Sequence, residues 1–70
     1  MESDDRAKLR ALLNYWIEHN WEHSQEFKEW ADKARVWGEA EIAKEILQAA
    51  RQLDKASGSL SQSLKRLEEG

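Results

Sequence analysis

Two histidines are the residues with the most evident chemistry in this 70-residue sequence. His19 and His23 are four residues apart, so on a helix both imidazole rings project from the same face. Paired imidazoles at this spacing suit Zn²⁺, Ni²⁺, Co²⁺ or Cu²⁺. Candidate third ligands are the carboxylates of Glu22, Glu26 and Asp54. The pair therefore indicates a small site for a divalent transition metal, although this spacing alone is not specific.

The same region also fits a purely structural interpretation. Asn20 and His23 fall within an apolar stripe, and the expected helix pairing sets Ser57 opposite them. A polar layer in a heptad core fixes register and oligomeric state at a cost in stability. We favour this interpretation, in which Asn20, His23 and Ser57 form a polar core layer and no cofactor is bound. The metal site is the alternative, and a flat apolar ligand held by His23 is a third hypothesis.

Catalytic chemistry finds little support in the sequence. The absence of Cys excludes cysteine nucleophiles, thiolate metal sites and disulfides. No glycine-rich phosphate loop is present, and the serines cluster in the second half of the chain without an organised base. The many acidic side chains have the pattern of solvated helix faces. We therefore expect a protein that is not an enzyme.

The net charge and the hydropathy of the sequence limit the classes of partner that the protein is expected to bind. The net charge of −3 and the pI of about 5.3 argue against binding to nucleic acid or to an anionic membrane. Mean hydropathy is −0.92, and no apolar run approaches the roughly 18 residues of a membrane span. The N-terminus is acidic and does not resemble a signal peptide. These features predict a cytoplasmic protein.

Two apolar stripes predict the helices that position the histidines. The first stripe has an alternating 4, 3 spacing and comprises Leu9, Leu13, Trp16, Asn20, His23, Phe27, Trp30, Ala34 and Trp37. The second has an alternating 3, 4 spacing and comprises Ala43, Ile46, Ala50, Leu53, Ser57, Leu60, Leu64 and Leu67. β-Branched residues are scarce, so a sheet is not expected. We expect a single domain with a helix over about 4–37, a turn over about 38–40 and a helix over about 40–68.

The expected fold class is all-α, an antiparallel two-helix hairpin. Folding the chain near residue 40 pairs Trp30 with Ala50 and His23 with Ser57. The alternative is a three-helix bundle in which the second helix breaks at Ser57–Ser59, because these residues flank Gly58 and match the start of a capping box. The uninterrupted heptad phase through this segment favours the hairpin.

A hairpin this small leaves much apolar surface uncovered. The side chains expected to pack against a second copy are Leu12, Trp16, Ile17, Trp21, Phe27, Trp30, Ile42 and Leu47. Domains of this size draw only about 3–5 kcal/mol from one core, so association is a natural means of stabilisation. We therefore expect a homodimer that forms a four-helix bundle. A different protein partner is an open alternative, and Trp21 is the residue that would mark its surface.

The first helix also resembles a known group of proteins. The residues that carry the resemblance are Trp16-Ile17-Glu18-His19-Asn20, Glu22-His23, Glu29-Trp30-Ala31 and Lys33-Ala34. They are similar to a core of Trp-Ile-Glu-His-Asn-x-x-His followed by Glu-Trp-Ala in short, uncharacterised prokaryotic helical proteins, largely from archaea and anaerobic bacteria. Their frequent His-rich tails imply nickel, cobalt or zinc handling, at positions matching His19, Asn20 and His23. This sequence has no His-rich segment, and Tyr15 stands where many relatives have His.

Overall fold

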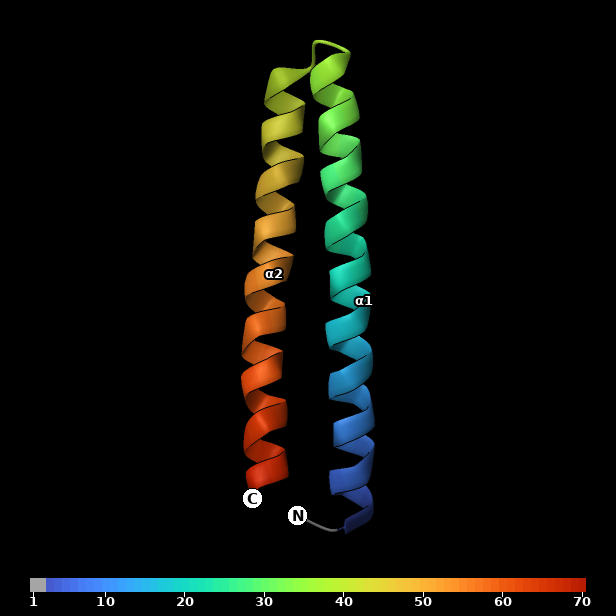
Figure 1. The fold of residues 1–70 in the computed structure, drawn as a ribbon, viewed down its shortest axis with the longest axis vertical. Helices are drawn as coiled ribbons and strands as arrows, with labels where there is room; N and C mark the ends of the chain where they lie inside the picture. Colours follow the sequence, from blue (N-terminus) through green and yellow to red (C-terminus); the bar gives the residue numbers. More distant parts are fainter. Residues whose placement is uncertain (1–2) are drawn as a thin grey trace.

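The computed structural model describes residues 3–70, which form two long antiparallel helices. Helix α1 spans Ser3–Val36 and helix α2 spans Ala40–Glu69, and the two lie side by side along their length (Figure 1). The hairpin measures 53 × 14 × 12 Å. The all-α hairpin is thus confirmed. The three-helix alternative is wrong, because α2 runs through Ser57–Ser59 without interruption.

A tight turn at Gly38 joins the helices. The amide of Glu39 donates to the carbonyl of Ala34 at 2.9 Å, and the amide of Gly38 donates to that of Arg35 at 3.0 Å. These two bonds form a Schellman motif, which requires a left-handed residue at its C′ position. Gly38 supplies it with a φ of +89°. The motif ends α1 sharply and turns the chain back against it.

Small side chains form the contact between the helices at the turn end. Ala31 and Ala34 of α1 and Ala43 of α2 are buried there, and Ser24 and Ala50 are fully buried further along. The rest of the contact is made by larger apolar side chains, with Leu13 and Leu67 buried near the open end. Ala and Ser residues allow two helix backbones to approach closely, since no long side chain separates them.

The contact differs from the predicted one on α1. All eight predicted positions of α2 are buried or half-buried, as expected. On α1, however, Trp16, Trp30 and Trp37 are 39%, 48% and 65% exposed, so their predicted place in the contact is wrong. Ile17 and Ala31, which follow Trp16 and Trp30, face α2 instead, as does Ser24 between them. The physical reason is size, because an indole between the backbones would prevent the close approach that the alanines allow.

The register is also shifted from the predicted one. Ser24 Oγ lies 3.4 Å from the carbonyl oxygen of Ala50, whereas the sequence pairing placed Trp30 opposite that residue. The shift follows from the turn. The chain folds at Gly38, within the predicted turn of about 38–40 but two residues before the position used for the predicted pairing, which moves every opposing pair along the helices.

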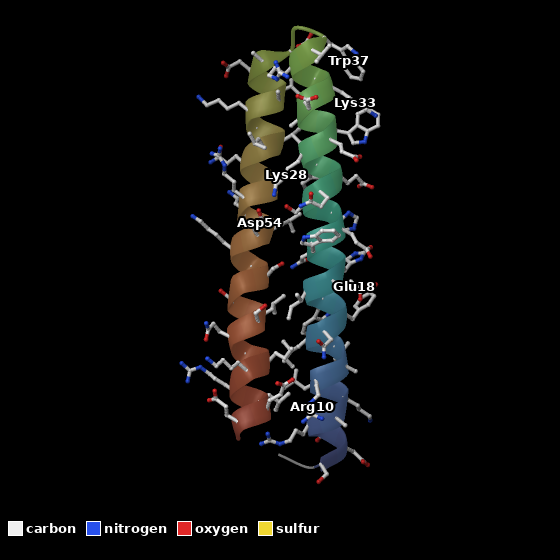
Figure 2. All side chains as sticks on the ribbon, in the orientation of Figure 1. Arg10, Glu18, Lys28, Lys33, Trp37 and Asp54 are labelled. Carbon is white, nitrogen blue, oxygen red and sulfur yellow. The ribbon has the colours of Figure 1, made fainter. Side chains whose placement is uncertain are left out.

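Polar contacts join the helices at two levels. Ser24 Oγ donates to Asp54 Oδ1 at 2.6 Å, and Lys28 Nζ donates to Asp54 Oδ2 at 3.2 Å. Figure 2 shows Lys28 and Asp54 directed toward one another between the helices. At the open end, Arg6 Nη1 donates to the carbonyl of Leu67 at 2.6 Å, where a cation suits the negative end of the α2 dipole. Within residues 3–70, neither helix carries the long apolar stretch needed to cross a membrane.

Candidate functional site: an exposed aromatic stripe around a histidine pair

The tryptophans that were predicted in the helix contact but lie outside it form a second stripe on α1. Trp16 and Trp30 each precede a residue that faces α2, so each is rotated from that residue by about 100° around the helix axis. We define the aromatic stripe as Leu12, Trp16, His19, His23, Trp30 and Trp37. Trp30 and Trp37 meet edge-on with their ring centroids 6.2 Å apart. Figure 2 shows Lys33 and Trp37 on the side of α1 that points away from α2.

Helix α2 extends this apolar surface. A shallow cleft of about 380 Å³ lies between the helices and is lined by Phe27 and Trp30 of α1 and by Ile46 and Ala49 of α2. Ile42, one turn before Ile46, is 49% exposed. The aromatic stripe and this edge of α2 therefore meet at the cleft, where Glu26 also lines the surface and Lys33 Nζ lies 4.2 Å from the centroid of the Trp30 ring.

The two predicted histidines are brought together within the stripe. Their Nε2 atoms are 3.1 Å apart, and the rings are nearly perpendicular with centroids separated by 4.3 Å. Tyr15 stacks on His19 at 5.4 Å, and Phe27 lies 6.2 Å from the ring of His23. Residues Tyr15, His19, His23 and Phe27 thus form a ladder of rings spaced four residues apart, which limits how the imidazoles can rotate.

A carboxylate borders the other nitrogen of His23. Glu26 Oε1 lies 3.5 Å from His23 Nδ1, in a pair that is substantially exposed to solvent. A carboxylate in this place favours the tautomer that carries its proton on Nδ1. In that tautomer, the Nε2 lone pair of His23 is directed toward His19.

The predicted third metal ligands are not assembled around the pair. Glu26 lies on the Nδ1 side of His23, and Glu22 borders a separate shallow pocket with Tyr15 and His19. Asp54 is bonded to Ser24 and Lys28. Over residues 3–70, no group of three or more His, Asp or Glu side chains is arranged to hold a metal ion. One hairpin therefore offers two imidazole ligands.

The expected polar core layer stays a prediction. Asn20 and Ser57 are half-buried, and His23 lies at the edge of the helix contact with its side chain 43% exposed. The Oγ atom of Ser57 is buried and has no hydrogen-bond partner among the described residues. The polar link that the structure does show joins Ser24, Lys28 and Asp54 instead.

This link was not predicted from the sequence, although a signal for it was present. Ser24 lies seven residues after Ile17 and seven before Ala31, which is the spacing of residues that share one helix face. The hydrogen bond from Ser24, and to a smaller extent the one from Lys28, holds the pKa of Asp54 below its ordinary value. Partial desolvation acts in the opposite direction and raises this pKa.

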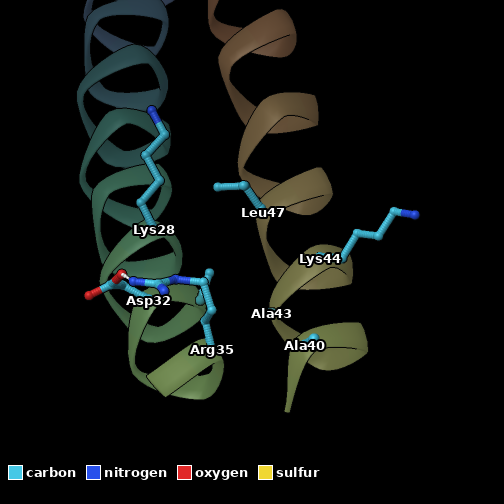
Figure 3. Close-up of a pocket in the computed structure, with 8 residues that line it drawn as sticks. Lys28, Asp32, Arg35, Ala40, Ala43, Lys44 and Leu47 are labelled. Atoms are coloured by element: carbon cyan, nitrogen blue, oxygen red, sulfur yellow. Dashed lines mark hydrogen bonds and ion pairs between the residues drawn. The ribbon is translucent and has the colours of Figure 1, made fainter. Parts of the chain in front are cut away.

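The predicted packing residues divide between two faces. Ile17 is half-buried in the helix contact, and Trp21 is 60% exposed on the opposite flank of α1, about 140° around the helix from Trp16. Leu47 lines another cleft, of about 360 Å³, which Lys28, Arg35 and Lys44 border (Figure 3). Trp21 and Leu47 therefore lie away from the apolar face that carries Leu12, Trp16, Phe27, Trp30 and Ile42.

Comparison with known families gives one match. The family described as a domain of unknown function, DUF8180, matches residues 9–67. The chain therefore belongs to this family, whose matched segment spans both helices and the turn. Neither the curated proteins nor the solved structures include one that matches the chain.

Proposed function

We propose that this protein is a non-enzymatic self-association module in which two hairpins pair through their aromatic stripes to form a four-helix bundle. The observation that carries the proposal is the spacing of the stripe. Trp16, His23, Trp30 and Trp37 of the stripe follow one another at intervals of seven residues, and Leu9 lies seven residues before Trp16, so His23 is the middle one of these five.

This spacing makes the stripe complementary to itself. In a two-fold symmetric interface, residue i of one copy contacts residue j of the other, and j contacts i. If two α1 helices cross antiparallel with His23 on the axis, Trp16 meets Trp30 of the second copy and Leu9 meets Trp37. Each large side chain then has an apolar partner, and the two histidine pairs lie close to the axis.

The exposed area is on the scale that an interface needs. A Trp side chain buries up to about 250 Å², so the exposed parts of Trp16, Trp30 and Trp37 together present roughly 400 Å². A standard interface buries about 800 Å² on each partner. Leu12 and Ile42, which are 44% and 49% exposed, and the cleft beside Phe27 add to the area of the three indoles. Covering this face would supply the apolar burial that a lone hairpin lacks.

The test is the absolute mass of the protein and of two matched Trp variants. By light scattering in chelator, we expect the wild type at twice its 8.2 kDa chain mass. Trp30→Glu should be a helical monomer, because it buries a charge in the interface. Trp21→Glu changes a Trp outside the stripe that is 60% exposed, against 48% for Trp30, and should stay dimeric. A monomeric wild type at all concentrations, or dissociation by Trp21→Glu alone, would contradict the proposal.

Disulfide trapping tests the antiparallel register. The chain has no Cys, so a single introduced thiol can form only an intermolecular bond. We expect His23→Cys to cross-link rapidly with itself under mild oxidation, because position 23 lies on the proposed axis. Val36→Cys, which is well exposed and outside the stripe, should cross-link slowly. Equal rates for the two variants would rule out this register.

A further inference from the structure

We propose that His19 and His23 chelate one Zn²⁺-class ion through their Nε2 atoms and that a second copy completes the coordination with the same pair. The first part stands on the geometry of one hairpin. The second part rests on the proposed self-association.

The separation of the two nitrogen atoms fits a shared ion. Zinc–imidazole bonds are about 2.0–2.1 Å long, so a tetrahedral angle sets the two nitrogens about 3.3–3.4 Å apart and a right angle sets them about 2.8–3.0 Å apart. The observed Nε2–Nε2 distance of 3.1 Å lies between these values. It corresponds to a nitrogen–metal–nitrogen angle of about 98° at a bond length of 2.05 Å. To accept the ion, the rings must rotate so that both Nε2 lone pairs point to it and no longer toward one another.

The surroundings hold both rings in this arrangement. Metal-bound histidines usually donate their other ring N–H to a carboxylate, which fixes the ring and raises its basicity. Glu26 Oε1, 3.5 Å from His23 Nδ1, is placed for this role. The ring of Tyr15 lies nearly parallel to that of His19, with 15° between the planes, and so restrains the second imidazole.

One hairpin leaves the coordination incomplete. No third His, Asp or Glu side chain joins the pair within residues 3–70, whereas structural zinc takes four protein ligands. His23 is the middle one of five residues at seven-residue spacing, so an antiparallel pair of α1 helices brings the two histidine pairs near one axis, each pair centred about 3 Å from that axis along its own helix. A relative shift of the two α1 helices by about one helical turn would bring the four imidazoles around one ion and make a complete tetrahedral site. The same ion then links the two copies, so metal binding and dimerisation strengthen each other.

The experiment is a Zn²⁺ titration by calorimetry, with Co²⁺ absorption as the report on geometry. We expect one ion per two chains and the intense visible bands of four-coordinate Co²⁺. His19→Gln and His23→Gln should each weaken binding more than about 100-fold, because each change removes two ligands from the bridged site. Glu26→Gln should weaken it by about 10-fold through the loss of the orienting carboxylate. Glu29→Gln, the same change elsewhere on α1, should have no effect.

Other outcomes of these measurements would overturn separate parts of the proposal. Unchanged affinity in both His variants would reject the histidine site. One ion per chain, without a change in mass, would reject the bridging ion. Light scattering in chelator distinguishes failure of the site from failure of the proposed function. A metal-free dimer that binds no Zn²⁺ retains the self-association and rejects the site. A metal-free monomer whose mass doubles with Zn²⁺ supports the site and rejects metal-free self-association.

Discussion

The two internal glycines should respond in opposite directions to the same substitution. Gly58 lies in the middle of α2, and a Cβ atom added there meets no atom within 4 Å. Gly38 also has open space around it, but its φ of +89° is a conformation that residues with a side chain rarely adopt. Space is therefore the same at both sites, and only the backbone conformation differs.

The expected magnitudes follow from that difference. Glycine in an exposed helix interior costs about 0.8–1.0 kcal/mol relative to alanine, so Gly58→Ala should stabilise the protein by about that amount. For a domain of this size, 1 kcal/mol corresponds to a rise in Tm of about 4–8 °C. Gly38→Ala should destabilise it by about 1–2 kcal/mol, because a left-handed residue with a Cβ is strained. The two variants should therefore differ by roughly 2–3 kcal/mol.

The assay is urea unfolding followed by circular dichroism, with all variants at one protein concentration because association shifts apparent stability. Equal stability of the two variants would refute the backbone argument. If Gly58→Ala destabilised the protein, position 58 would be covered in the assembly. Repeating the measurement in the Trp30→Glu background would show whether the covering group belongs to a second copy.

Two further predictions concern the contact between the helices. Because the pKa of Asp54 is lowered in the folded state, its contribution is present above its ordinary pKa and is lost as pH falls through the lower folded value. Asp54→Asn should therefore destabilise the protein at neutral pH and have a smaller effect in acid below about pH 4. If the substitution shifted the urea midpoint equally at both pH values, this prediction would be contradicted. Ala50→Leu should cost about 1–3 kcal/mol, since Ala50 is fully buried opposite Ser24. Ala49→Leu adds the same atoms beside the cleft and should be close to neutral in the same urea unfolding experiment.

The overall hairpin was predictable from the sequence because its signals are local. The α2 stripe has one dominant apolar face, and its heptad phase continues through Gly58 without a slip. Gly38 marks the turn, because few other residues tolerate the left-handed conformation that a Schellman motif requires. The Nε2 atoms of His19 and His23 meet because both residues lie on one helix, where the spacing alone sets their distance.

The face of α1 that meets α2 was not predictable from periodicity. Alternate members of the predicted stripe belong to different surfaces, because Leu13 and Ala34 are buried against α2 whereas Trp30 is exposed. Both surfaces repeat every seven residues, so spacing cannot choose between them. Side-chain volume makes the choice, because Ser24 and Ala31 permit close approach to the alanines of α2. The long-range partner of Asp54 was missed for the same reason, since it depends on which face is turned inward.

The unequal apolar content of the helices argues for α1 as the centre of an assembly. Residues of α2 opposite its contact face, such as Gln48, Lys55 and Gln62, are polar and exposed, so that helix has one apolar side. Helix α1 has apolar side chains buried against α2 and a second set, including Trp16 and Trp30, that is largely exposed beside this contact. A helix that is apolar on more than one side is stable in water only when those sides are covered. Pairing through α1 covers the second side, whereas pairing through the outer face of α2 would leave it in water.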